Sequence, residues 1–282
     1  MILSLKSKIL NSNNKKIKII SSFVKKLSDD DIFGLTAELT FYLTMSFFPF
    51  MILLLALISI TPLSLEETLF SLLSNLSKEI YDIVYYILTG VERSTTIIIT
   101  SGVVAIWSIS RAIATINKAL NRMYETDESR SFIIIRVIGF VFAILLALII
   151  ILTFFLLIMG NLIGVAILKF FPSFNILWHT LRLIMICVII LIFLSIIYKV
   201  LPNKSLKFNS VKYGAVFTSV LWVGSSTSFS FYIDNFANYH ILYGSLAGIV
   251  VLITWLYICS IMLLLGGEIN SIIYLKNTPI SR

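Results

Sequence analysis

The chain has 282 residues, of which 59% are hydrophobic and only 13% are charged. Its mean hydropathy is +1.00 and its formal net charge is +8. So few charges cannot cover so much apolar surface in water, and the composition therefore excludes a soluble enzyme, a disordered tail, a collagen-like chain and a disulfide scaffold. The remaining class is an all-α, polytopic membrane protein, because the apolar runs are long enough to be helices rather than barrel strands.

Residues 1–33 are rich in lysine and precede the first long apolar run. We expect them to form a basic cytoplasmic arm and not a signal peptide, because no small-residue cleavage site follows that run. Contact of this arm with anionic lipid is one interpretation. A simple topology signal is the interpretation that we favour.

Six windows have the roughly 20 mostly apolar residues that a bilayer crossing needs. The sequence therefore predicts a transmembrane helical bundle of about six spans within residues 34–270, followed by a cytoplasmic tail at 271–282. The predicted spans are 34–60, 95–117, 132–158, 177–198, 213–236 and 242–265.

The connection between the first two spans, residues 61–94, is the one long loop. Its apolar residues recur every three or four positions from Leu65 to Ile87, which predicts an amphipathic helical segment on the outer face. Lys and Arg gather before the first span, in the second and fourth connections and after the last span. The positive-inside rule then places both termini in the cytoplasm, which requires an even number of spans.

Three charges fall in the cytoplasmic half of the predicted bundle. Glu38 lies near the start of the first span, Arg111 lies about 10 Å inside the second, and Glu268 lies at the end of the last. A guanidinium at that depth costs on the order of 2.5–3.5 kcal/mol, so it should face the protein interior and have a partner. We therefore expect an ion pair between Arg111 and either Glu38 or Glu268.

This polar cluster has two interpretations. It forms a cavity that opens to the cytoplasm and handles an anionic or zwitterionic ligand, or it forms a structural pair that holds three helices together. The structural interpretation is the simpler one, because a satisfied ion pair needs no ligand. A second group of candidate residues comprises Ser110, Asn117, Asp234 and Tyr243.

Sequence motifs for cofactor, metal or nucleic acid chemistry are absent from the chain. It has no phosphate-binding G-x-x-x-x-G-K-[ST] loop, no G-x-S-x-G elbow, and only two histidines, which are far apart. We read Cys187 and Cys259 as packing residues, because both lie in apolar runs. We expect no cofactor, no metal and no nucleic acid partner. Membrane lipids, a lipid-like or anionic substrate and a second copy of the chain are the expected partners.

Several motifs resemble those of the YihY/virulence factor BrkB family of integral membrane proteins, over about residues 31–270. They are Ala37-Glu38-Leu39-Thr40-Phe41-Tyr42, Trp107-Ser108-x-Ser110-Arg111, Leu201-Pro202-Asn203, Tyr239-x-x-x-Tyr243-Gly244-Ser245-Leu246 and Leu265-Gly266-Gly267-Glu268-Ile269-Asn270. The resemblance implies a multi-pass protein of the bacterial cytoplasmic membrane. The family has also carried a ribonuclease label, which the residues themselves do not support.

Three functions remain as hypotheses. The leading one is a non-enzymatic protein that moves or accommodates a lipid-like or small anionic molecule without hydrolysing ATP, with Arg111 as the cation. The second is a structural or assembly factor for envelope proteins, in which the charges are purely structural. The third, a membrane-bound ribonuclease, is the least supported.

Overall fold

The computed structural model of the chain describes residues 23, 25–59, 95–149, 152, 175–236 and 246–277. All regular secondary structure in these ranges is helical. The prediction of an all-α fold is therefore confirmed. The predicted amphipathic segment at 61–94, and most of the arm at 1–33, lie outside the described residues.

The described helices follow the predicted spans closely. They are α3 (Ile32–Ser59), α6 (Thr95–Met123), a helix over Phe132–Ile149, α8 (Asn175–Val200), α9 (Phe208–Phe236) and α11 (Ala247–Asn277). Hydroxyl side chains inside these helices donate back to the carbonyl four residues earlier, as Thr36 does to Ile32 at 2.7 Å and Thr40 does to Thr36 at 2.7 Å. Such bonds satisfy polar groups in an apolar setting.

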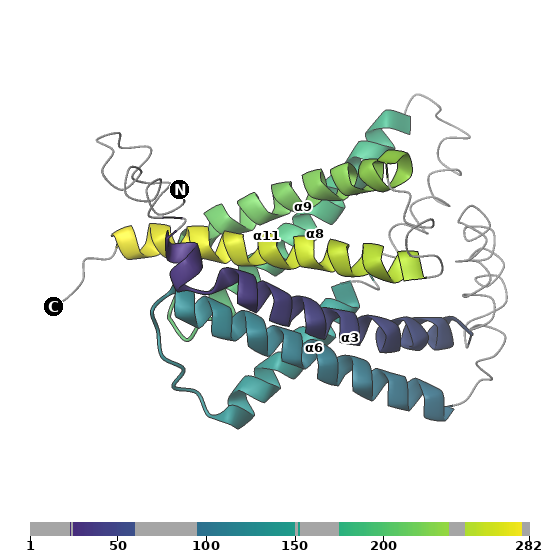
Figure 1. The fold of residues 1–282 in the computed structure, drawn as a ribbon, viewed down its shortest axis with the longest axis horizontal. Coiled ribbons are helices and arrows are strands. Elements are labelled where there is room, and N and C mark those ends of the chain that lie inside the picture. The colour runs from purple at the N-terminus through teal and green to yellow at the C-terminus, as the bar shows by residue number, and fades with distance from the viewer. Residues whose placement is uncertain are drawn as a thin grey trace, which may run out of the picture.

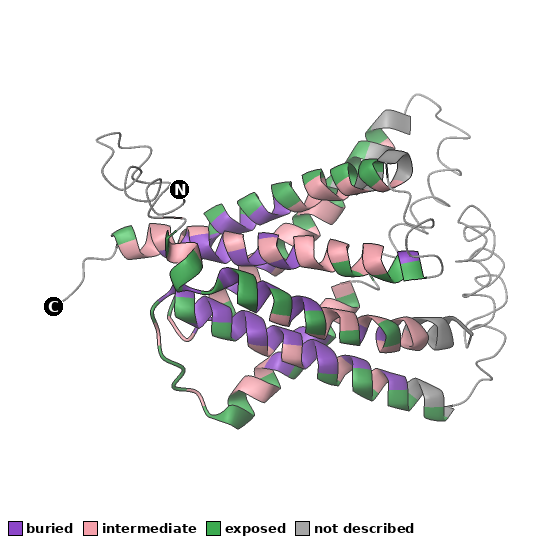
Figure 2. Ribbon diagram, viewed as in Figure 1, coloured by how far each residue is buried: buried purple, intermediate pink, exposed green. Residues whose placement is uncertain are grey.

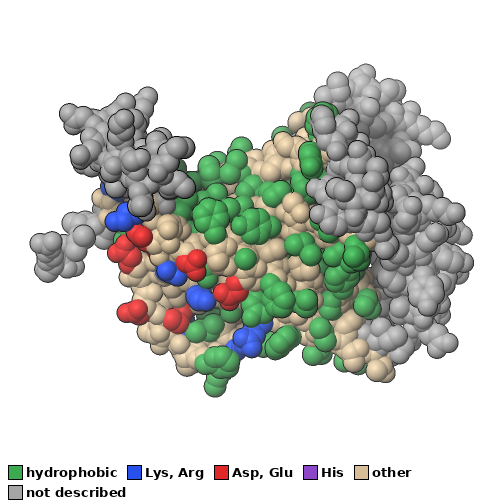
Figure 3. All heavy atoms as spheres, in the orientation of Figure 1, with side chains coloured by type: hydrophobic (Ala, Val, Ile, Leu, Met, Phe, Trp, Pro, Cys, Tyr) green, Lys and Arg blue, Asp and Glu red, His purple; other side chains and the backbone are tan. Residues whose placement is uncertain are grey.

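The helices form one bundle in which α3 lies between α6 and α11 (Figure 1). Helix α11 also packs on α9, and α9 packs on α8. The start of α3, the end of α6 and the end of α11 lie at the same end of the bundle (Figure 1). We call this the charged end, because the visible charged side chains gather there, whereas hydrophobic side chains cover much of the remaining face (Figure 3).

Burial follows the inner faces of the helices (Figure 2). Large hydrophobic side chains also cover the outer faces, among them Val103 on α6 and Val220 on α9, which are 62% and 66% exposed. Such an exterior suits lipid and not water. Four described helices are long and apolar enough to cross a membrane: Ile32–Leu53, Ile99–Met123, Phe132–Ile149 and Ala247–Lys276.

The other two predicted spans coincide with α8 and α9. In the described part of α8, the apolar stretch Ile184–Val200 is shorter than a full crossing. Helix α9 has 29 residues, but its many Ser and Thr residues lower its hydropathy. Six spans therefore stay a prediction, whereas the helical bundle itself is observed.

Two glycines allow α9 and α11 to approach closely. A Cβ at Gly214 would collide with the carbonyl oxygen of Gly266, and a Cβ at Gly266 would collide with the Thr218 hydroxyl. The Gly214 backbone N–H donates to Asn270 Oδ1 at 2.6 Å. The glycine and asparagine of the motif Gly266-Gly267-Glu268-Ile269-Asn270 therefore serve the packing of these two helices.

Candidate functional site

Arg111 does not pair with either predicted carboxylate. Its guanidinium lies over the Trp107 ring, 5.4 Å from the ring centroid, and it joins no ion pair among the described residues. The Arg111 Nε is buried and has no hydrogen-bond partner. The expected pairing with Glu38 or Glu268 was therefore wrong, because both acids are held by lysines.

Glu38, on α3, forms an ion pair with Lys118, which is the charged residue that follows Arg111 along α6. Its Oε2 lies 3.1 Å from Lys118 Nζ, and its Oε1 accepts a hydrogen bond from the Thr115 hydroxyl at 3.1 Å. Both partners are partly exposed, with 37% of the Glu38 side chain and 64% of the Lys118 side chain accessible. An exposed pair of this kind contributes little, roughly 0–1 kcal/mol.

Glu268 binds a residue of the N-terminal arm. Its side chain is fully buried, and Oε1 lies 3.2 Å from Lys26 Nζ. The same nitrogen lies 3.4 Å from Asp30 Oδ2 and donates to the Met123 carbonyl oxygen at 2.8 Å and to Ser271 Oγ at 3.2 Å. Lys26 thus joins the arm to the ends of α6 and α11. No sequence feature distinguishes it from the other lysines before the first span.

The second unpaired arginine lies where the Phe132–Ile149 helix crosses α6. A Cβ at Gly139 would lie 2.7 Å from Ser110 Oγ, so the two helices meet closely at this point. Arg136 precedes Gly139 by three residues and therefore lies on the same face of its helix. One guanidinium nitrogen of Arg136 is buried without a partner, and its nearest aromatic contact is Phe132, whose ring centroid is 5.1 Å from the guanidinium carbon.

Three buried donors therefore lack acceptors near this crossing. They are Ser110 Oγ, Arg111 Nε and an Arg136 guanidinium nitrogen. Ser110 is 1% exposed, so water does not reach it from outside the bundle. A buried donor without an acceptor costs about 1–3 kcal/mol. An anionic group accepts hydrogen bonds from such donors, whereas a cation does not. We name these three residues the donor crossing.

Arg130, in contrast, has several acceptors around its side chain. Its Nε and one terminal nitrogen each donate to Glu128 at 2.7 Å, and that terminal nitrogen also donates to Asn117 Oδ1 at 2.9 Å and to the Leu201 carbonyl oxygen at 2.8 Å. Asn117, which was one of the candidate residues, thus has a structural contact that fixes the 124–131 loop. We name Asn117, Asn121, Glu128 and Arg130 the loop clamp.

The loop clamp holds Glu128 in its charged form. Hydrogen bonds from Arg130 lower the pKa of Glu128 from 4.5 to about 2, against the opposing effect of burial, and the amides of Asn117 and Asn121 add to the lowering. The two amides donate to Oε2 of Glu128 at 2.9 and 2.8 Å. The carboxylate therefore stays ionised at any physiological pH.

The same clamp reaches the connection between α8 and α9. The Asn203 backbone N–H donates to Asn121 Oδ1 at 2.6 Å, and its side-chain amide donates to Ser129 Oγ at 2.8 Å. Lys204 donates to the Tyr124 carbonyl oxygen at 3.1 Å. The motif Leu201-Pro202-Asn203 is thus explained by contacts between two loops.

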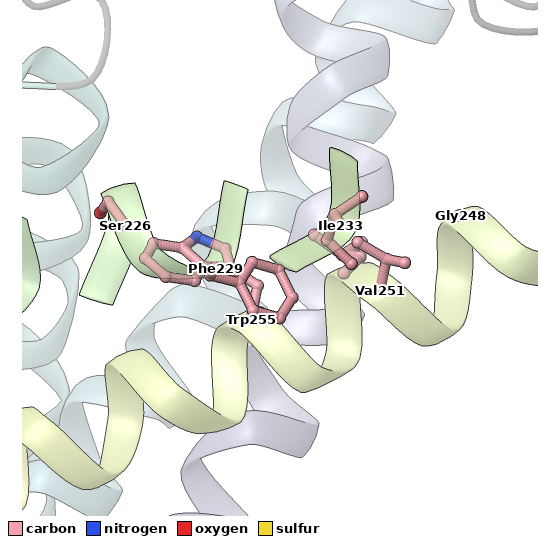
Figure 4. Close-up of a pocket in the computed structure, with 7 residues that line it drawn as sticks. Ser226, Phe229, Ile233, Gly248, Val251 and Trp255 are labelled. Atoms are coloured by element: carbon pink, nitrogen blue, oxygen red, sulfur yellow. The ribbon is translucent and has the colours of Figure 1, made fainter. Parts of the chain in front are cut away.

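The described part of the bundle contains a cavity and an open groove that are both lined mainly by apolar side chains. A small cavity of about 80 Å³ lies in the middle of the bundle, and apolar side chains such as Leu39, Ile113 and Phe193 line it. An open groove of about 390 Å³ lies between α9 and α11, beside the stacked rings of Phe229 and Trp255 (Figure 4). Its one hydroxyl, on Ser226, donates to the Trp222 carbonyl oxygen. The groove therefore suits an acyl chain better than a polar solute.

Two candidate residues lie outside what the structure can place. Tyr243 falls outside the described residues, and Asp234 lies within α9 at a position whose side chain is not described. The residues that sequence reasoning missed are Lys26, Asp30 and Arg136. Of these, only Arg136 carried a signal, because it lies inside the predicted third span.

A model of the virulence factor BrkB family matches residues 23–280, which is nearly the whole chain. The chain belongs to the virulence factor BrkB family. A ribonuclease-like protein of Bacillus subtilis, YfkH, is 34% identical to this BrkB-family chain over 244 residues, which cover 85% of the chain and 89% of YfkH. No solved structure matches the chain.

Shorter matches link this BrkB-family chain to proteins described only as membrane proteins. The UPF0761 membrane protein VV0203 of Vibrio vulnificus is 36% identical over 75 residues, and PBPRA3489 of Photobacterium profundum is 40% identical over 75 residues. Each match covers 27% of the chain and 24% of the relative. The chain is therefore an α-helical membrane protein of a family whose names establish no specific activity.

Proposed function

We propose that the chain accommodates or moves an anionic, lipid-like molecule of the membrane, and that the donor crossing binds its anionic group. The observation that carries this proposal is the missing acceptor. Ser110, Arg111 and Arg136 each bury a donor atom without a partner in the described part of the chain. Phosphate oxygens accept several such bonds at once, and guanidinium groups match their geometry.

The position of the site favours a lipid over a soluble anion. Trp107 and Phe132, the rings that contact the two arginines, are 51% and 71% exposed on the outer surface. Arg111 lies about 18 Å before the end of α6. A guanidinium at that depth calls for an anionic partner, and a lipid supplies a phosphate to a group beside the bilayer-facing surface.

A second function, that of an assembly factor, is favoured by the other motif residues. Gly214, Gly266 and Asn270 form helix contacts, and Asn117 and Asn203 fix loops. These contacts stabilise the fold and need no ligand. Arg111 distinguishes the two functions, because it makes no structural ion pair. Chemistry on RNA has no support beyond the name of one relative, and incubation of the purified chain with RNA tests it.

Movement of fluorescent phosphatidylglycerol between the leaflets of reconstituted vesicles tests the transport proposal. We expect Arg111→Ala to reduce the rate at least tenfold while the protein inserts and folds normally. Lys118→Ala is the matched control, because it removes a positive charge from the same helix at an exposed ion pair and should leave the rate unchanged. An Arg111→Ala protein that folds normally and retains the full rate would refute the proposal.

A further inference from the structure

The two acids beside Lys26, Asp30 and Glu268, form a second site. The donor crossing lacks hydrogen-bond acceptors, whereas this site lacks hydrogen-bond donors. Glu268 is fully buried and Asp30 is 9% exposed. Both Glu268 carboxylate oxygens, and Oδ2 of Asp30, are buried without a hydrogen-bond donor among the described residues. These atoms lie at the charged end of the bundle, where the start of α3 meets the ends of α6 and α11 (Figure 1).

A count of N–H and O–H groups shows the shortage. The Lys26 ammonium has three N–H groups, of which one binds the Met123 carbonyl oxygen and one binds Ser271 Oγ. The Ser271 hydroxyl donates its own hydrogen to the Glu268 backbone carbonyl oxygen at 2.9 Å. One Lys26 N–H therefore remains for the carboxylates of Asp30 and Glu268, and the unpaired Tyr124 hydroxyl is the other donor group that faces Glu268.

The charges show the same shortage. Two carboxylates face one ammonium, so the cluster carries an excess negative charge away from water if both acids are ionised. The other titratable group that faces Glu268 is Tyr124, whose pKa is raised by burial and by the neighbouring Tyr274 and Glu268. Tyr124 therefore stays neutral. Lys204 lies over the Tyr274 ring and gives its hydrogen bond to the Tyr124 carbonyl oxygen, so it does not reach the acids.

We propose that Asp30 and Glu268 form a proton-binding site in which the two carboxyl groups share one proton beside Lys26. The shared proton supplies the missing donor, since one carboxyl O–H then donates to the other carboxylate. It also makes the cluster neutral, with one carboxylate opposite one ammonium. A buried, balanced pair of charges is tolerated, whereas a second buried carboxylate without a counter-charge is not.

Because the site lies where the N-terminal arm contacts α6 and α11, binding or loss of the proton should affect how these segments pack. Lys26 holds residues 25–29 against the ends of α6 and α11, and Asp30 follows directly. Loss of the proton would repel the two carboxylates from each other and loosen this junction. The site thus couples proton binding to the packing of three helices, independently of any ligand at the donor crossing.

Infrared spectroscopy of the purified chain in lipid nanodiscs tests the proposal. We expect the absorption band of a protonated carboxylic acid at neutral pH, and we expect the band to disappear in both Glu268→Gln and Asp30→Asn. Glu38→Gln is the control, because Glu38 is a partly exposed acid paired with Lys118 and should leave the band intact. Lys26→Met should keep the band present to a pH about one unit higher, because the ammonium no longer favours the ionised form.

Isotope labelling keeps the test decisive if the variants do not fold. In the wild-type chain, carbon-13 in aspartate or glutamate carboxyl groups should shift the band. A spectrum without a band that responds to either label would overturn the proposal.

Discussion

The loop clamp and the donor crossing are both built around arginine, yet they differ in what surrounds the guanidinium. Arg130 meets Glu128, Asn117 and the Leu201 carbonyl within 2.9 Å. Among the described residues, the guanidiniums of Arg111 and Arg136 contact aromatic rings alone, and each buries a nitrogen without an acceptor. An arginine paired with a carboxylate and a backbone carbonyl stabilises the fold, whereas one whose buried nitrogen lacks an acceptor is available to a ligand. The comparison therefore distinguishes an arginine that the fold satisfies from two that it does not, and the proposed function depends on the second kind.

The largest expected effect follows from removal of Arg130. Arg130→Met should lower the free energy of unfolding by about 2–3 kcal/mol, because it removes the counter-charge of Glu128 and the hydrogen bonds that Arg130 donates to Glu128 and to the Leu201 carbonyl. Arg111→Met should cost less than about 1 kcal/mol, since no carboxylate loses its partner. Denaturant titration of both variants in the same detergent measures the difference, and equal losses would contradict the comparison.

Lipid dependence should show the reverse order. We expect phosphatidylglycerol to raise the melting temperature of the wild-type chain above its value in phosphatidylcholine, because a bound ligand stabilises the folded state. Arg111→Met should weaken this binding about tenfold, which is about 1.4 kcal/mol. Lys118→Met should preserve the lipid effect. Calorimetry of each variant in the two lipids makes the measurement, and a full effect in Arg111→Met would place the anion elsewhere.

Acid should weaken the loop clamp through Glu128. Its pKa falls from 4.5 to about 2 on folding, so its contribution to stability is complete above pH 4.5 and is lost as the pH drops toward 2. Glu128→Gln should be less stable than wild type at neutral pH, and the gap should close across that range. Unfolding curves at several acidic pH values measure this, and a constant gap would show that the carboxylate charge is not what holds the loop.

A lysine at position 111 should produce a smaller change than methionine. Arg111→Lys keeps the positive charge but loses the planar fork that can donate to two phosphate oxygens at once. We expect transport and lipid binding to fall about threefold, between wild type and Arg111→Met, from the loss of part of one hydrogen bond. Flux and lipid-binding assays on the three proteins give the order, and equality of Lys and Met would show that geometry matters more than charge.

The smallest expected effect concerns the turn that leads into the clamp. Glu125 has φ 50° and closes α6, where the Thr126 N–H bonds the Asn121 carbonyl and the Glu125 N–H bonds the Arg122 carbonyl. Glycine adopts this conformation without the steric cost that other residues incur. Glu125→Gly should therefore stabilise the chain by about 0.5 kcal/mol, and the midpoint of chemical denaturation measures it.

The sequence predicted the helical bundle and drew attention to Arg111, but it did not predict the ion pairs. Apolar runs predicted the helices, and the depth of Arg111 marked it as unusual. The rule that a buried charge has a nearby opposite charge failed there, because Lys118 is closer to Glu38 and Lys26 reaches Glu268. Nothing in the sequence distinguishes Lys26 from the other N-terminal lysines, since its partner Ser271 is 245 residues away.

The sequence by itself determined that this is an all-α membrane protein, because hydrophobicity and its run length are properties of the chain alone. Only the tertiary structure decided which buried polar atoms find partners. That outcome depends on how helices cross, as at Gly139 on Ser110 and at Gly214 on Gly266. A hydrogen bond forms or fails over fractions of an ångström, and such distances are set by packing and not by the order of residues.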